Sequence, residues 1–298
     1  MALRSPALAG FLVGLLTAAT PLAALSKVAP EAPACPASFA DERVPALTNP
    51  KLSERAVPLC FGAFAVLHSG ASRTPLYAAE RLTRKSVAAA RRVERADAFH
   101  EEERLAEDDR ASLSDYVHSG FDRGHLAPAG DMPSAASQAE SFSLANIVPQ
   151  NRTFNRSLWA AIEESVRRLA TQRGEIFVVT GPIFEGASTR AIKGRVLVPT
   201  ALFKAVYDPR SGEAGAYLAP NDGSGDWRTV SLATLREKAG IDVFPGLPDA
   251  AKARAMTLPE PREFARDGSG WNATLDTLKR QALHFLRYLW RELLRAIF

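Results

Sequence analysis

Ser-Gly-Phe-Asp-Arg-Gly-His-Leu-Ala-Pro-Ala-Gly-Asp-Met, residues 119–132, is the stretch of sequence on which the interpretation of the whole chain depends. It places a carboxylate, a guanidinium, a glycine and an imidazole in four consecutive positions, Asp122 to His125. A histidine can take a proton from water and an arginine can hold an anion, so this pairing suits phosphate chemistry. The glycine between them permits close approach of backbone or substrate. The alternative is a buried structural histidine beside a surface arginine.

A second group of polar residues lies on a predicted helix about thirty residues further along. Apolar residues recur there at steps of three and four between Asn155 and Thr171, which predicts a helix that ends at Gly174. Eight residues of α-helix turn by about 800°, so Asn155 and Glu163 lie about 80° apart, roughly on one face. The amide oxygen of Asn155 is a hard ligand of the kind that Mg²⁺ accepts beside several waters, which Glu163 would hold. The alternative is an asparagine helix cap and a solvated glutamate.

Taken together, the two groups resemble the DNA/RNA non-specific endonuclease family, whose members include secreted bacterial nucleases and mitochondrial endonuclease G. The family signature Asp-Arg-Gly-His stands at 122–125, and the second block stands as Asn146-Ile-Val-Pro-Gln150 followed by Asn155, Trp159 and Glu163. The resemblance runs from about Cys60 to Leu247, where residues 240–247 are similar to the closing segment of the family. Two blocks in the right order and spacing are a specific match.

The resemblance implies an α+β protein with the ββα-metal nuclease fold, in which helices flank a central, mostly antiparallel sheet. It also implies one divalent ion, Mg²⁺, with Mn²⁺ as a substitute. The roles that it implies are the general base for His125, the sole direct metal ligand for Asn155, orientation of the hydrated metal for Glu163, shaping of the site for Asn146, phosphate binding for Arg95, phosphate binding or support of the site for Arg123, and a structural role for Asp122.

The function that follows is Mg²⁺-dependent, sequence-non-specific hydrolysis of DNA and RNA phosphodiesters, with His125 activating water. Cleavage without sequence preference is expected because contacts to the phosphate backbone carry no base information. A homodimer is compatible with the sequence. Two alternatives stay open: a non-catalytic nucleic-acid-binding module, and another phosphodiesterase on the same scaffold.

The distribution of charge excludes a strongly basic nucleic-acid-binding body. The chain of 298 residues has a formal net charge of +4, the last twenty residues supply +4, and residues 1–26 supply +1, which leaves the body at about −1. Phosphate affinity must therefore come from local arginines. Few phosphate contacts predict a shallow dependence of binding on salt.

The N-terminus predicts export. Arg4 precedes an apolar stretch over residues 7–16, and Ala24-Leu25-Ser26 fits a signal-peptide cleavage site, so residues 1–26 are interpreted as a signal peptide of a periplasmic or secreted protein. The alternative is an uncleaved anchor. The two cysteines, Cys35 and Cys60, then predict a disulfide that closes a loop of about 25 residues and stabilises the fold by roughly 3 kcal/mol.

Four regions are expected along the chain. These are the signal peptide (1–26), an extended lead-in (27–59), the nuclease domain (60–250), and a linker with an amphipathic helix (251–298). Within the domain, apolar runs predict strands over 60–68, 76–83, 175–180, 195–199, 202–207 and 214–218, with Gly181-Pro182 ending the third, and helices over 134–142 and 231–239. The basic amphipathic helix from about residue 272 to 298 either lies on an anionic membrane surface or packs on the domain.

Overall fold

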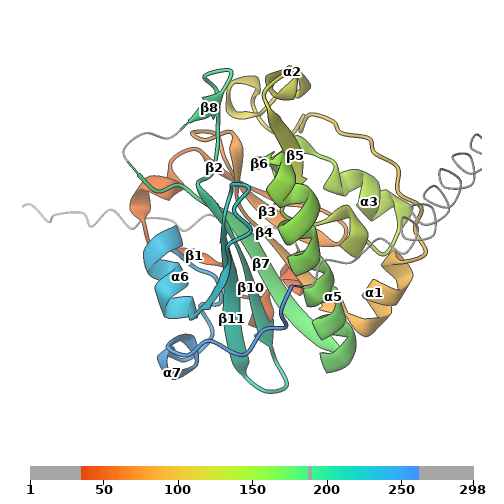
Figure 1. Cartoon of the computed structure of the whole chain (residues 1–298), viewed down its shortest axis with the longest axis vertical. Helices are drawn as coiled ribbons and strands as arrows, with labels where there is room; N and C mark the ends of the chain where they lie inside the picture. The colour runs from red at the N-terminus through yellow and green to blue at the C-terminus, as the bar shows by residue number, and fades with distance from the viewer. Residues whose placement is uncertain (1–34, 187–189, 262–298) are drawn as a thin grey trace, which may run out of the picture. The chain divides into compact units, whose positions relative to one another are not determined.

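A seven-stranded antiparallel sheet forms the centre of the computed structural model, which describes residues 35–186 and 190–261 (Figure 1). The strand order is β12-β11-β10-β7-β4-β3-β2. The strands of this sheet are β2 (Ala56–Cys60), β3 (Phe64–Ser69), β4 (Thr74–Thr83), β7 (Glu175–Ile183), β10 (Ala201–Asp208), β11 (Glu213–Pro220) and β12 (Arg228–Val230). The predicted α+β class with a mostly antiparallel sheet is therefore confirmed.

Three two-stranded ladders and a set of helices surround this sheet. The ladders pair β1 (Ala46–Leu47) with β13 (Ile241–Asp242), β5 (Phe121–His125) with β6 (Ile147–Asn151), and β8 (Ala191–Ile192) with β9 (Val196–Leu197). The α-helices are α1 (Arg84–Ala90), α2 (Leu113–Tyr116), α3 (Ala135–Ser141), α4 (Arg152–Phe154), α5 (Ala160–Arg173), α6 (Leu232–Ala239) and α7 (Asp249–Lys252). The 3₁₀ turns are η1 (Pro36–Ser38), η2 (Ala40–Glu42), η3 (Pro50–Ser53), η4 (Glu107–Asp109), η5 (Ala129–Asp131) and η6 (Leu144–Asn146), and η7 (Asn155–Trp159) is a π-helix.

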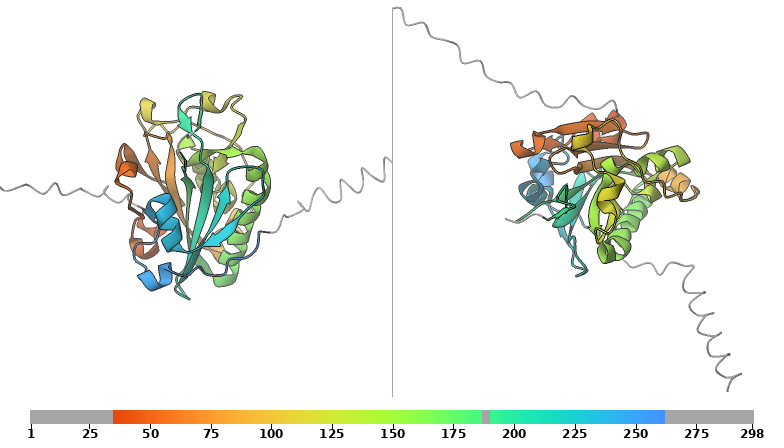
Figure 2. Two further views of the ribbon diagram at one scale, coloured as in Figure 1. Left: turned by 60° about the vertical axis from the view of Figure 1, so that its left-hand side comes forward. Right: turned by 90° about the horizontal axis from the view of Figure 1, so that it is seen from above.

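Each face of the sheet has its own hydrophobic core, because successive side chains of a strand point to opposite faces. On β10, Leu202 and Val206 belong to a core that includes Trp159 and Ile162 of the long helix. Phe203, between them, belongs to a second core with Leu232 and Leu235 of α6. Figures 1 and 2 show α5 and α6 on opposite sides of the sheet. The candidate site residues all lie on the side of α5.

A disulfide joins Cys35 to Cys60 at the end of β2, with the two Cα atoms 5.8 Å apart. The segment before residue 60 is more than an extended lead-in, since β1 pairs with β13 and β2 forms one edge of the main sheet. The expected domain boundary at residue 60 thus falls at the end of a sheet strand. The predicted disulfide is present in the structure.

Three strand predictions were wrong in their extent. The apolar run 60–68 is split, because Phe61 N–H donates to Phe64 C=O over 3.0 Å and turns the chain between β2 and β3. β7 continues through Gly181-Pro182 to Ile183, where it pairs with β10 but no longer with β4. Pro182 is tolerated because its missing N–H falls where only one neighbouring strand is paired. The strand expected at 195–199 is reduced to Val196–Leu197.

Two predictions concern segments outside the described residues: the signal peptide at 1–26 and the amphipathic helix at 272–298. Within the described ranges, no helix has both the length and the apolar character that a membrane span requires.

Candidate active site

A hairpin and a helix bring the predicted residues together. β5 and β6 pair antiparallel, so His125 lies opposite Ile147, and Asp122 lies opposite Gln150. The chain then passes from Asn151, whose side-chain oxygen caps the helix by accepting from Phe154 N–H, into α4, η7 and α5. β5 carries the imidazole, and the helix carries amide and carboxylate side chains that line the same cavity.

His125 is buried in a cluster with two aromatic rings, which also contact each other. Its ring centroid lies 5.5 Å from that of Phe99 and 4.9 Å from that of Phe142. Burial, and then the nearby Arg95 guanidinium, lower the pKa of His125 to about 3. Its Nε2 has no hydrogen-bond partner within the described residues. At ordinary pH the imidazole is therefore neutral.

The π-helical turn η7 improves the alignment of Asn155 and Glu163. A regular α-helix would leave these residues about 80° apart around the axis. Between Asn155 and Trp159 the helix is instead closed by i→i+5 hydrogen bonds, which use more residues for each turn and so reduce that offset. Both side chains consequently face the same cavity. Such local widening of a helix is frequent at functional sites.

The amide of Asn155 is oriented by Asp122. Nδ2 of Asn155 donates to Oδ2 of Asp122 over 3.2 Å, which directs the amide oxygen away from this carboxylate. Asp122 also accepts from Nε of Arg156 over 2.7 Å, and from Nη2 of Arg156 over 3.1 Å. Hydrogen bonds from Arg156 and Asn155 outweigh the effect of burial and hold the pKa of Asp122 below its usual value. Asp122 is therefore a carboxylate that positions Asn155.

The donor set fits a hydrated magnesium ion. Asn155 offers one amide oxygen to the cavity, and the carboxylate of Glu163 makes no hydrogen bond to any described side chain or backbone group. Within residues 35–186 and 190–261, no cluster of three or more His, Cys, Asp or Glu could hold a metal by itself. Mg²⁺ needs no such cluster, because it keeps several waters and takes one or two protein oxygens. Asn155 would hold the ion and Glu163 its waters.

Several charged side chains surround Glu163 and affect its pKa. Arg167, one turn further along α5, donates to Asp131 over 2.8 Å and to Glu164 over 2.8 Å. Burial raises the pKa of Glu163 to about 7, although Lys204 and Arg167 act to lower it. Glu163 thus gains or loses its negative charge near neutral pH. Binding of a metal ion that depends on this carboxylate should therefore vary with pH in that range.

Two exposed arginines are placed by the phenylalanines that flank His125. The guanidinium carbon of Arg123 lies 4.2 Å from the ring centroid of Phe99, and that of Arg95 lies 5.5 Å from that of Phe142. Stacking on a ring restricts each side chain and leaves donors for an anion. Each of the two guanidinium groups thus lies on a different phenylalanine of the ring cluster around His125.

A cavity of about 640 Å³ unites these groups. It is lined by Arg95, Asp97, Phe99, Asp122, Arg123, His125, Pro128, Ala129, Gly130, Asn155, Arg156, Ala160, Glu163 and Arg167. Five of the six predicted active-site residues therefore share one cavity, and Asn146 is the exception. The roles that the resemblance implies for them stay predictions.

Asn146 is buried and contacts backbone only. Its Oδ1 accepts from Ala127 N–H over 2.9 Å, and its Nδ2 donates to the carbonyls of Ala127 and Ser141 over 2.8 and 2.9 Å. These three hydrogen bonds of the Asn146 amide fix the loop that follows His125. Asn146 does not line the cavity.

Gly124 is required by a neighbouring side chain. A Cβ atom at this position would lie 2.1 Å from Cδ of Gln150, whose buried side chain crosses the strand there. The expectation that the glycine admits backbone or substrate is wrong, because Gln150 fills that space. Nε2 of Gln150 lies 3.5 Å from the carbonyl oxygen of His125, so this contact helps fix the end of β5.

Sequence reasoning missed Arg167, Arg156 and the two phenylalanines of the site. Arg167 follows Glu163 by four residues, and this spacing puts both on one helix face, so the helical period could have identified it. Phe99 and Phe142 carried no such signal, because their contact with His125 depends on the pairing of distant segments.

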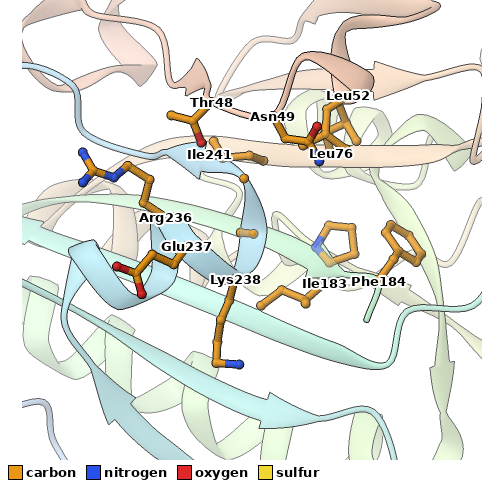
Figure 3. Close-up of a pocket in the computed structure, with 13 residues that line it drawn as sticks. Thr48, Asn49, Leu52, Leu76, Ile183, Phe184, Arg236, Glu237, Lys238 and Ile241 are labelled. Atoms are coloured by element: carbon orange, nitrogen blue, oxygen red, sulfur yellow. The ribbon is translucent and has the colours of Figure 1, made fainter. Parts of the chain in front are cut away.

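A second cavity, of about 420 Å³, lies between the 48–52 segment and the C-terminal end of α6 (Figure 3). The side chains around it include Asn49, Ile183 and Lys238. It contains none of the predicted site residues. The candidate active site is therefore the cavity around His125.

The hairpin that ends in His125 and the helix that carries Asn155 and Glu163 together are the core of a ββα-metal nuclease fold. The family described as DNA/RNA non-specific endonuclease matches residues 46–250, and the chain belongs to this family. The match covers both sequence blocks and every residue of the candidate site.

Named relatives agree with this membership. The chain is 30% identical over 201 residues to "Nuclease 1, mitochondrial" of Schizosaccharomyces pombe, a match that covers 59% of this chain and 62% of the relative. It is 36% identical over 158 residues to "Nuclease EXOG, mitochondrial" of Danio rerio, covering 46% of each. The chain thus spans about half to three fifths of the length of these relatives.

A solved structure shares the fold. A chain in the crystal structure titled "Crystal structure of the EndoG/EndoGI complex: Mechanism of EndoG inhibition" matches with a TM-score of 0.58 and 24% identity. The match covers 67% of this chain and 91% of that chain. At this level of identity the likeness concerns the fold.

Proposed function

We propose that this protein is a Mg²⁺-dependent endonuclease that hydrolyses phosphodiester bonds of DNA and RNA without sequence preference. The observation that carries the proposal is the meeting of a neutral buried imidazole (His125), an oriented amide (Asn155) and a carboxylate (Glu163) in one cavity edged by arginines. Membership of the nuclease family supports it.

The residues divide the reaction between them. His125 accepts a proton from the water that attacks phosphorus, since its imidazole is neutral and lines the cavity. Arg95 and Arg123 hold the non-bridging oxygens of the phosphate from their positions on the flanking phenylalanines. Asn155 would hold the hydrated ion, and Glu163 would orient its waters. The ion, when bound, would supply stabilisation of the negative charge that develops on the phosphate.

Lack of sequence preference follows from the composition of the cavity wall. Its polar side chains are arginines, carboxylates, one amide and one imidazole, which suit a phosphate and a metal. Contacts to phosphate position a nucleic acid and carry no base information. DNA and RNA are therefore both expected substrates.

The test is plasmid nicking and RNA digestion by the full chain with Mg²⁺, with Mn²⁺ and with EDTA. We expect cleavage of both substrates with either metal and none with EDTA. His125→Ala and Asn155→Ala should each lower the rate by about 10²–10⁴-fold. The control is His118→Asn, which changes an exposed histidine whose φ of 55° asparagine tolerates. A His125→Ala variant that kept most of its activity would refute the assignment.

The same experiment separates the two alternatives. Binding of nucleic acid without metal-dependent cleavage would indicate a non-catalytic module, and hydrolysis of small diesters but not of nucleic acids would indicate another phosphodiesterase. The structure favours the nuclease, because the cavity holds a complete set of groups for hydrolysis and several arginines for an extended anion.

We also propose that the protein is exported, with residues 1–26 as its signal peptide. The Cys35–Cys60 disulfide supports this proposal, because such bonds persist in oxidising compartments. N-terminal sequencing of the protein recovered from culture medium or periplasm tests it: the mature chain should begin near Lys27. Contact of the 272–298 segment with an anionic membrane surface and formation of a homodimer stay predictions.

A further inference from the structure

Two arginines beside the cavity share one carboxylate. Arg156 binds Asp122 through Nε at 2.7 Å and Nη2 at 3.1 Å, and Arg152 contacts the same carboxylate through Nε at 3.4 Å. The arginine side chains are 65% and 64% exposed, whereas that of Asp122 is 13% exposed. A partly enclosed carboxylate therefore holds two guanidinium groups that project into solvent.

The cluster of Asp122, Arg152 and Arg156 has a net positive charge and, among the described residues, unpaired hydrogen-bond donors. One carboxylate neutralises one of the two guanidinium groups, so the three side chains together carry a charge of +1. Nη1 of Arg156 and both Nη atoms of Arg152 make no hydrogen bond within the described part of the chain. Planar N–H groups that are fixed at one edge and free at the other suit a phosphate oxygen pair.

The position of the cluster relates it to the catalytic groups. Arg156 lines the same cavity as His125 and directly follows Asn155 in the chain. Arg152 lies one helical turn earlier, outside the residues that line the cavity. The guanidinium group of Arg156 thus lies at the cavity, and that of Arg152 lies beyond it at the N-terminal end of the helix. Arg95 and Arg123 form a separate pair, which stacks on Phe142 and Phe99.

We propose that Arg152 and Arg156, held by Asp122, form a second phosphate subsite that binds the phosphate next to the one being cleaved. This inference rests on the proposed nuclease function and adds to it a preference for chains with at least two neighbouring phosphates. A lone phosphodiester then uses only half of the binding surface.

The test compares short substrates that differ in one phosphate. The dinucleotide dTpdT has a single phosphodiester, and the same dinucleotide with a 5′-phosphate or with a 3′-phosphate adds one neighbour on a known side. We expect one phosphorylated form to show a kcat/KM about tenfold above that of dTpdT, the factor that ~1.4 kcal/mol from one charge-assisted contact produces. The preferred form also gives the direction in which the strand crosses the site.

Variants then assign this preference to residues. In Arg156→Gln and in Arg152→Gln, the ratio of kcat/KM between the preferred form and dTpdT should fall towards one. On long single-stranded DNA, each variant should reduce the slope of log Kd against log salt by about one phosphate contact. Arg81→Gln is the matched control, because Arg81 is also exposed and binds Glu175 through two hydrogen bonds of 2.8 and 3.1 Å, outside the cavity wall. Its ratio should equal that of the wild type.

The outcomes separate the subsite from the nuclease function. Equal cleavage of all three dinucleotides by the wild type would overturn the subsite alone. If the wild type cleaved neither the dinucleotides nor longer nucleic acid, the proposed function itself would be overturned. A ratio that stays at the wild-type value in both variants would also overturn the subsite. In that case Arg156 only holds Asp122, and any loss of activity would affect every substrate equally. Thermal melting of each variant checks that the fold is kept.

Discussion

Nδ2 of Asn155 donates a hydrogen bond of 3.2 Å to Oδ2 of Asp122, and this contact decides which end of the amide faces the cavity. An ionised carboxylate can only accept hydrogen bonds, so the nitrogen of the amide must face it. The oxygen is thereby left for a metal ion. The aspartate of the Asp-Arg-Gly-His stretch thus acts through its neighbour on the helix.

Asp122→Asn is predicted to weaken metal binding. An asparagine at 122 can donate as well as accept, so it no longer selects one orientation of the Asn155 amide. The Mg²⁺ concentration for half-maximal cleavage should rise by roughly 10–100-fold, as is typical when a group that orients a metal ligand is removed. Activity measured against Mg²⁺ concentration checks this. Asp108→Asn, at an exposed position outside the cavity wall, should match the wild type.

Metal affinity is predicted to fall as the pH drops below about 7. Burial raises the pKa of Glu163 to about 7, so its carboxylate gains a proton in that range and loses its charge towards the hydrated ion. His125, with a pKa of about 3, stays neutral throughout and contributes nothing to the change. Calorimetric titration with Mn²⁺ from pH 5.5 to 8.5, without nucleic acid, measures the effect. In Glu163→Gln the affinity should be low and independent of pH, and a flat profile in the wild type would contradict the prediction.

Glu80→Gln is predicted to stabilise the fold increasingly as the pH rises. Glu80 is 2% exposed, and neither carboxylate oxygen has a hydrogen-bond partner in the described part of the chain. Burial and then Asp131 raise its pKa well above the usual value. The folded protein therefore binds a proton that the unfolded chain releases above a pH of about 4.3, and its stability falls as the pH rises from there towards the folded pKa.

Urea unfolding at pH 5 and at pH 8 tests this sign. The difference in unfolding free energy between Glu80→Gln and wild type should be larger at pH 8. Glu213→Gln, an exposed position at the start of β11, is the control and should show no such change. An unchanged difference at the two pH values would mean that Glu80 is ionised in the folded protein.

Asn146→Ala is predicted to destabilise the protein as well as inactivate it. The substitution leaves the N–H of Ala127 and the carbonyls of Ala127 and Ser141 without partners in a buried place. A loss of about 2–4 kcal/mol is expected from one multiply bonded buried group. Chemical unfolding should show this loss in Asn146→Ala, whereas His125→Ala should lose activity at nearly wild-type stability. Equal stability of the two variants would contradict the prediction that Asn146 acts through the fold.

Local patterns in the sequence predicted much of the fold. Apolar spacing identified the helix through Trp159 and Ile162, and the run at 176–179 identified a strand, because burial on one or both faces leaves a regular signal. The break between β2 and β3 was missed, since the turn at residues 61–63 contains Phe, Gly and Ala and depends on one backbone hydrogen bond. Gly181-Pro182 was wrongly predicted to end its strand for a similar reason. Whether this pair ends β7 depends on which neighbouring strand is still paired there.

For the candidate site, too, local motifs could be read from the sequence and contacts between distant segments could not. Two motifs were enough to identify His125, Asn155, Glu163 and Arg123, and the wider resemblance identified Arg95; all five line one cavity. The reason for Gly124 was not readable, because the side chain that occupies its space belongs to the opposite strand. The resemblance implied that Asn146 shapes the site, but its partners, backbone groups of two other segments, could not be read from the sequence. Contacts between distant segments are what the sequence leaves undetermined.

The π-helical turn from Asn155 to Trp159 makes chain length itself a requirement of the site. Insertion of one residue there would rotate the amide by about 100° relative to the carboxylate at 163. Every functional side chain would still be encoded, yet the amide and the carboxylate would face different directions. Deletion of one residue would instead let the turn close as ordinary α-helix, in which seven residues turn by about 700° and leave the two side chains within about 20° of one face.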